Sequence, residues 1–267
     1  MITVNGNPIT INGNFINDVI EVLPPYTLRL KFKDDVTPTF SYGTGVQVSS
    51  SPNIWDLTYE NNSWWNLLRN QSSLLEVIDG NTTNVSSMYG MLNSCSSLSS
   101  ISLLDTTNVK NMQIMFTDCS SLQSVPLFNT SKVTNMDGMF NRCASLTSVP
   151  LFDTSKVTIM DFMFCRNTQL TNVPTFNTTN VRSMNSMFYQ CQNLQYVPLF
   201  DTSNVSSMQS MFRDCINVES GALALYKQAS TQTKPPWNHS WTFTNCGINT
   251  QTGSAELSQI PYSWREV

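Results

Sequence analysis

The chain has 267 residues, enough for one large domain or two small ones with a sizeable core. Only 12% of the residues are charged and the net charge is −4, with no cluster of Lys and Arg. Because nucleic-acid phosphates require a basic surface, this composition argues against a nucleic-acid partner. The absence of any apolar run near the roughly 18–20 residues that span a bilayer argues against membrane insertion.

The N-terminal segment, residues 1–50, has the pattern of a small β module. An Ile-Thr-x-Asn-Gly-Asn sequence occurs at residues 2–7 and again at 9–14, and each Asn-Gly pair is a strong tight-turn signal. Residues 26–33 alternate between apolar and polar, as a half-buried strand does. We expect this module to dock the protein or to support its oligomerisation.

Residues 51–73, with Trp55, Trp64 and Trp65, are expected to form an aromatic N-terminal cap. From Leu74 to residue 217 the sequence repeats six times with a period of 24. A fixed period in the twenties with apolar residues at fixed sites is the signature of stacked coils. The apolar columns include a Val column (Val85, Val109, Val133, Val157, Val181, Val205) and a Met column (Met91, Met115, Met139, Met163, Met187, Met211).

The unit from Leu146 to Gln169 shows what one coil should contain. Its first part fits the L-x-x-L-x-L strand of a leucine-rich repeat, with Val149 and Leu151 inward and Thr147, Ser148 and Pro150 outward. The short polar residues at 153–155 predict a turn with N-cap chemistry. Val157, Met160, Met163 and Phe164 then lie on one stripe of a short helix or 3₁₀ segment.

The predicted fold class is therefore an α/β repeat. We expect a leucine-rich-repeat solenoid of 24-residue coils, with a parallel strand ladder, short helices and the small N-terminal β module. Residues 218–267 should close its C-terminal end. In this cap, residues 221–229 read as a short helix, and Trp237, Trp241, Phe243 and Trp264 supply apolar surface around His239.

Two columns carry polar or reactive side chains. Five cysteines follow the period, whereas the fourth coil has Asn167 at that position and Cys165 two residues earlier. Small buried hydrophobes explain this column better than a metal site, because CxxC-like spacing is absent. At the turn position occupied by Asp153, Asn and Asp alternate from coil to coil. This alternation avoids a repulsion of about 3 kcal/mol between carboxylates about 5 Å apart. A calcium ladder, the competing interpretation, would favour Asp in every coil.

Catalytic chemistry is not indicated. His239 is the only histidine, and there is no G-x-S-x-G elbow, dinucleotide loop or P-loop. We therefore expect no catalytic residues, no metal and no cofactor. The remaining candidate is the outward strand face, which is rich in hydroxyls and amides. Such groups can bind sugars or protein backbone, but they are equally common on a solvent-exposed strand that binds nothing. The predicted binding residues there are Gln123, Thr147, Thr171, Asn172, Gln195 and Tyr196.

The repeat V-P-x-F-[DN]-T-[ST]-x-V-x-x-M-x-x-M-F-x-x-C-x-x-L, over residues 74–217, resembles the BspA-like leucine-rich repeats. This variant is found in Mycoplasma lipoproteins and many bacterial surface proteins. The segments PYTLRLKFKDDVTPTF and GALALYKQAS through AELSQIPYSW are similar to flanks that the repeat carries in gut bacteriophage and prophage proteins. The resemblance implies adhesion or host-surface recognition without catalytic residues.

The N-terminal sequence lacks the basic and apolar regions of a secretory signal peptide, and there is no lipobox cysteine or C-terminal anchor. A phage virion protein needs none of these. We therefore expect a non-enzymatic virion component such as a head or tail fibre, an oligomer that contacts other virion proteins and a host surface protein or glycan. The alternatives are a bacterial cell-surface adhesin and, least favoured, a glycan-active enzyme.

Overall fold

The computed structural model describes the backbone of residues 3–4, 7–8, 10–11 and 14–15, and the chain over 23–24, 26–48, 53–59 and 61–266. Near the N-terminus, β1 (Thr3–Val4) pairs antiparallel with β2 (Asn7–Pro8), and β3 (Thr10–Ile11) pairs with β4 (Asn14–Phe15). Two short hairpins are therefore present where the sequence predicts them.

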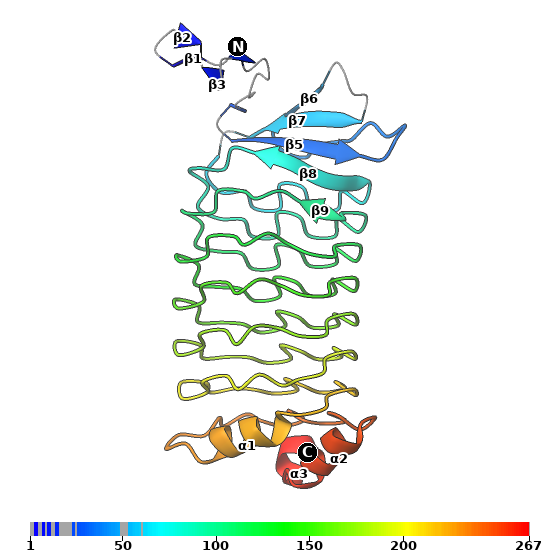
Figure 1. The fold of residues 1–267 in the computed structure, drawn as a ribbon, viewed down its shortest axis with the longest axis vertical. Helices are drawn as coiled ribbons and strands as arrows, with labels where there is room; N and C mark the ends of the chain where they lie inside the picture. Colours follow the sequence, from blue (N-terminus) through cyan, green and yellow to red (C-terminus); the bar gives the residue numbers. More distant parts are fainter. Residues whose placement is uncertain are drawn as a thin grey trace.

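The main body is a pile of similar coils that runs the length of the molecule (Figure 1). Corresponding residues in neighbouring coils form parallel bridges, as between Ser87 and Asn111 or between Asn135 and Ile159. The bridges continue at 24-residue steps from Ser63 to Ser207, so neighbouring coils lie at about the 4.8 Å spacing of paired strands. The predicted repeat fold is thus present, with one coil for each 24-residue period.

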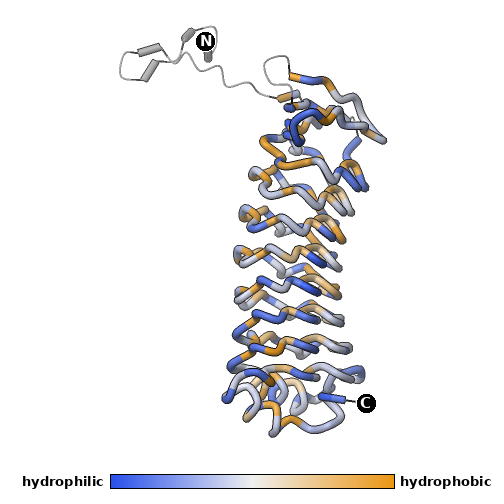
Figure 2. The backbone as a smooth tube through the Cα atoms, turned by 90° about the vertical axis from the view of Figure 1, so that its right-hand side faces the viewer, coloured by the Kyte–Doolittle hydropathy of each residue, from blue (hydrophilic) through white to orange (hydrophobic). Residues whose placement is uncertain are grey.

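The core is a set of parallel columns of apolar side chains. Hydrophobic positions recur at matching points of successive coils in Figure 2. Phe116, Phe140, Phe164, Phe188 and Phe212 stack directly on one another, with ring centroids 5.1 to 5.7 Å apart. A second column, Phe128, Phe152, Phe176 and Phe200, packs beside the first. The Val and Met columns are also buried, so one continuous core serves all the coils.

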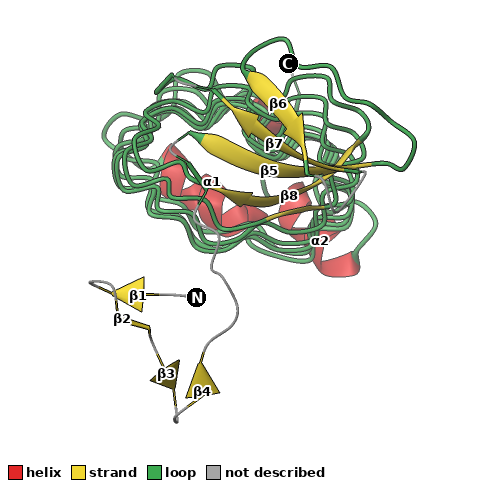
Figure 3. Ribbon diagram, turned by 90° about the horizontal axis from the view of Figure 1, so that it is seen from above, coloured by secondary structure: helices red, strands yellow, loops and turns green. Residues whose placement is uncertain are grey.

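The N-terminal end of the pile is covered by a five-stranded sheet with the order β6-β7-β5-β8-β9 (Figure 3). Its strands are β5 (Thr27–Phe32), β6 (Thr44–Gln47), β7 (Ile54–Thr58), β8 (Leu74–Gly80) and β9 (Ser100–Ile101). Because β5 lies between β7 and β8, this sheet extends across the predicted division at residue 50. Residues 26–48 therefore form one sheet with the first coils.

The predicted short helix or 3₁₀ segment does not form as a continuous element in the described coils. Over residues 88–95 the chain makes consecutive tight turns instead, in which Met91 and Cys95 donate backbone hydrogen bonds three residues back. The intervening N–H groups of Gly90 and Ser94 donate to the next coil. Both residues have left-handed φ angles, +58° and +62°, which a helix cannot contain. The apolar stripe is thus buried, but hydrogen bonds between coils replace those of a helix.

The predicted parallel strand ladder is reduced to single parallel bridges, as between Tyr196 and Ser220, beyond the pair formed by β8 and β9. At that pair Ser102 donates its N–H to Val77, whereas the matching position in later coils is proline, beginning with Pro126. Proline has no N–H, so this bond cannot be repeated. Phe128 instead bonds back to Pro126, a three-residue turn around Leu127. In the coil of Pro150, Leu151, predicted to point inward, is 61% exposed, and Phe152 is buried in its place. The coil without this proline has the same arrangement, with Leu103 exposed and Leu104 buried.

The turn that follows this strand position agrees with the prediction. The Asp153 carboxylate accepts a hydrogen bond from the backbone N–H of Ser155, and the other coils repeat this arrangement. The adjacent threonine is buried and donates its hydroxyl to the next coil, as Thr154 does to the Asn177 carbonyl at 2.7 Å. These residues therefore join the coils as well as turning the chain.

The C-terminal end carries α1 (Ala222–Ser230), α2 (Gln251–Ser258) and α3 (Tyr262–Arg265). The predicted helix at 221–229 thus forms. Phe243 stacks on Phe212 and also contacts Trp264, which extends the phenylalanine column into the cap. Trp237, predicted to belong to the cap core, is 78% exposed. Among the described residues, no helix combines the length and apolarity that crossing a bilayer requires.

Candidate functional site

The predicted binding residues lie on one side of the pile, as a polar strip. Gln123, Thr147 and Gln195 are exposed and stand in one column, in which the backbone N–H groups of Thr147 and Gln195 donate to the carbonyl of the residue 24 positions earlier. Thr171 belongs to this column but is only partly exposed. Asn172 and Tyr196 stand in the neighbouring column, and both are exposed. The structure thus brings all six together, while their role in binding remains a prediction.

Beside this strip runs a row of exposed leucines that the sequence interpretation placed inside. Leu103, Leu127, Leu151 and Leu199 occupy one column and are 64, 59, 61 and 48% exposed. Asp79 and Thr175 occupy the same column in the other two coils. A shallow cavity of about 360 Å³ lies between the first two of these leucines, next to the Asp105 turn. We call these four leucines the leucine row.

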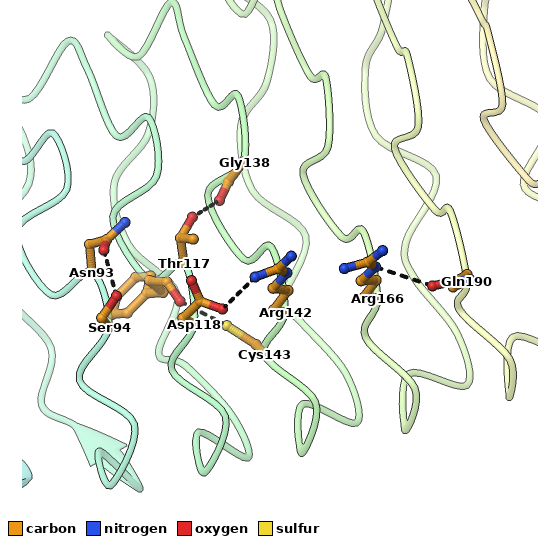
Figure 4. A network of polar contacts seen from close by, with 10 residues as sticks. Asn93, Ser94, Thr117, Asp118, Gly138, Arg142, Cys143, Arg166 and Gln190 are labelled. Atoms are coloured by element: carbon orange, nitrogen blue, oxygen red, sulfur yellow. Dashed lines mark hydrogen bonds and ion pairs between the residues drawn. The ribbon is translucent and has the colours of Figure 1, made fainter. Parts of the chain in front are cut away.

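A second surface lies on the tight-turn side of the coils, where a groove of about 290 Å³ opens. Arg142 and Arg166 stand on adjacent coils at matching positions, and Figure 4 shows them side by side. Arg142 pairs with Asp118 at 3.5 Å, while Arg166 donates to the Gln190 amide oxygen at 3.1 Å. Asp118, Arg142, Arg166 and Gln190 therefore form one row along the stack (Figure 4).

Aromatic rings complete this surface. The Arg166 guanidinium lies 5.8 Å from the centre of the Tyr189 ring, and Arg213 lies 5.9 Å from the same ring. Phe162, also on the groove, is 44% exposed and has a φ of +55°. The sequence interpretation missed this surface, because its charged residues come from single coils and interrupt the repeat rather than follow it.

The cysteines support the structural interpretation. All seven are free and buried, and in the regular column each thiol donates to a carbonyl of the preceding coil, as Cys143 does to Phe116 at 3.0 Å. Burial raises the pKa of the Cys95 thiol to about 12. Such a thiol stays protonated at neutral pH, so it is unsuited to metal binding or nucleophilic attack.

Titratable groups elsewhere also have structural roles. Hydrogen bonds from Ser155 lower the pKa of Asp153, and those from Ser203 lower that of Asp201. His239 stacks on Trp264 with ring centroids 4.3 Å apart, within the C-terminal cap. Over the described ranges, no group of three or more His, Cys, Asp or Glu residues could hold a metal ion.

Stacked coils with one common period define a repeat protein, and comparison with known families gives its class. The family model described as "Mycoplasma protein of unknown function, DUF285" matches residues 63–164 and 121–224. Together the matches cover more than half of the chain, so the chain belongs to this family.

Among solved structures, the chain is similar to the crystal structure of a leucine-rich repeat protein from Eubacterium ventriosum. The identity is 21% and the TM-score 0.35, over 46% of this chain and 32% of the other. The match therefore spans about a third of that protein's length. The comparison with curated proteins found no match.

Proposed function

We propose that this chain is a non-enzymatic recognition protein whose stacked coils form a leucine-rich-repeat solenoid and bind a host surface protein. The repeat family and the fold fit a surface recognition protein. The observation that carries the proposal is the leucine row, where four large apolar side chains are exposed in one column. Scattered surface leucines are ordinary, but Leu103, Leu127 and Leu151 stand on three adjacent coils, and an apolar patch edged by polar groups is typical of a protein interface.

The polar strip next to the leucine row would supply the rim of this interface. Its hydroxyls and amides, including those of Thr147 and Gln195, can hydrogen-bond to a partner without the cost of burying a charge. Tyr196, 44% exposed, adds an aromatic anchor of the kind enriched at binding hot spots. The leucine row and the strip together form the proposed protein-binding face.

Replacing Leu127, Leu151 and Leu199 with threonine tests this face. Thr175 naturally occupies the same column, so the triple variant should fold and unfold like the parent. Binding is measured by flow cytometry with labelled protein on a panel of bacterial strains. On the strains that the parent protein recognises, we expect the triple variant to bind at least about tenfold more weakly, because each leucine buried in an interface contributes on the order of 1.5–3 kcal/mol. Lys156→Thr, at an exposed turn position, is the control. Unchanged cell binding by the triple variant would contradict the proposal.

We further propose that the protein is part of a phage particle, as a head or tail fibre, with the N-terminal segment contacting other virion proteins and supporting a homo-oligomer. The similarity of its flanking segments to those of repeat-bearing phage proteins supports this placement over a bacterial cell-surface adhesin. No observation on the described residues favours a glycan-active enzyme.

A truncation tests the docking role. Deleting residues 1–50 would remove β5 and expose the edge of β8, so the informative variant starts at residue 23 and keeps the whole five-stranded sheet. We expect this variant to fold with unchanged thermal unfolding but to be absent from purified particles, as detected by mass spectrometry. Its normal incorporation into particles would rule out docking through the first 22 residues.

A further inference from the structure

We propose that the groove containing Arg142, Arg166, Phe162 and Tyr189, here called the arginine groove, binds an acidic sugar unit through its carboxylate. This inference rests on the proposed recognition role and adds a second surface with a defined ligand class. The groove lies on the tight-turn side of the coils, and these four residues come from three consecutive coils.

The charges of the groove are the first argument. Arg142 and Arg166 occupy the same position in adjacent coils, so the stack places two like charges next to each other. Asp118 neutralises Arg142, whereas Arg166 has a neutral amide partner and no carboxylate partner in the described part of the chain. A bound carboxylate would supply the missing negative charge, and the planar guanidinium matches it in a two-point contact.

The aromatic side chains are the second argument. Phe162 is 44% exposed and adopts a left-handed backbone conformation, at a position where other coils have Gly, Asn, Ser or Ile. The left-handed conformation itself is common to this position in every coil, from Asn66 to Ser210, so what sets this coil apart is its large exposed ring. The Tyr189 ring beside it lies between the guanidinium groups of Arg166 and Arg213. Together these rings offer an apolar surface for the flat face of a sugar.

The polar groups of the groove are the third argument. Asn141 lines it, and the buried Oδ1 atom of Asn141 has no hydrogen-bond partner among the described residues. Buried acceptors are nearly always hydrogen-bonded, so this atom is suited to accept a bond from a ligand hydroxyl. Ser186 and Ser210 add hydroxyls to the same lining. A volume of about 290 Å³ is at the small end of ligand sites and suits one monosaccharide unit.

Binding of trigalacturonic acid to the full chain, by isothermal titration, is the test. The methyl-esterified trimer is the matched ligand, because it keeps the rings and hydroxyls but removes the charge. We expect the acid to bind at millimolar concentration or below, more weakly as salt rises, and the ester to bind at least about tenfold more weakly.

Each variant has a natural precedent within the stack. Gln190 follows Arg166 in its column and Ser186 follows Phe162, so Arg166→Gln and Phe162→Ser should fold normally. Each is expected to weaken binding of the acid by about tenfold. Arg182→Gln removes the same charge outside the arginine groove and should leave binding unchanged.

Three outcomes would overturn the inference: no binding of the acid, equal binding of acid and ester, or equal weakening by Arg166→Gln and Arg182→Gln. The threonine variant of the leucine row should keep its affinity for the trimer. The arginine groove and the protein-binding face can therefore fail separately.

Discussion

Replacing Phe164 with alanine is expected to lower the free energy of unfolding by about 3–5 kcal/mol. The ring is fully buried and stacks between Phe140 and Phe188, at centroid distances of 5.7 and 5.4 Å. It also packs against Phe176 in the second column. The coils above and below are held at a constant spacing by backbone hydrogen bonds, so they cannot collapse into the cavity. Urea denaturation followed by circular dichroism would measure the loss.

Leu151→Ala is the matched control for this variant. Both residues belong to repeating apolar columns, but Leu151 is 61% exposed, so its replacement should change the free energy of unfolding by no more than about 0.5 kcal/mol. If the two substitutions had similar costs, the assignment of Leu151 to the surface and of the phenylalanines to the core would be wrong.

Asn167→Cys is expected to stabilise the protein, by about 2 kcal/mol. Asn167 occupies the cysteine column and is fully buried, and neither polar atom of its side chain has a hydrogen-bond partner in the described structure. A thiol at this position can donate to the Phe140 carbonyl, as Cys143 and Cys191 donate to the matching carbonyls of Phe116 and Phe164. The substitution would thus remove two unpaired buried atoms and continue the column. The measurement is again the urea midpoint.

Cys143→Asn is the reverse experiment. It places the same amide in a fully buried site of a neighbouring coil, where the thiol now donates at 3.0 Å. We expect a loss of stability of about the size gained by Asn167→Cys. A gain from Cys143→Asn, or a loss from Asn167→Cys, would show that the amide is better accommodated in the stack than its surroundings indicate.

The repeat could be read from the sequence because every coil has the same neighbours. A residue 24 positions along meets the same environment, so the Val, Met and Cys columns are visible without coordinates, and they are indeed buried. The polar turn at Asp153 was predictable for the same reason, since a short side chain that caps backbone N–H groups is a local device.

The conformation within each coil could not be read from the sequence in the same way. The spacing of Val157, Met160 and Met163 is that of a helix, but consecutive tight turns bury the same stripe. Such turns leave alternate N–H groups free to donate to the next coil. Hydrogen bonds between stacked coils therefore take the place of those within a helix. Leu151 and Phe152 are both apolar, and the path of the backbone within the folded coil decides which one faces the core.

The arginine groove depends entirely on tertiary structure. Phe162 and Arg166 lie on one coil and Tyr189 on the next, and none of these residue types recurs at its position in every coil, so no motif in the sequence connects them. The sequence by itself therefore determined that the chain folds by stacking identical units and which columns form the core, because those properties repeat every 24 residues. Only the tertiary structure decided which side chains meet on the surface, because that depends on the path of the backbone inside each coil and on the contact between adjacent coils.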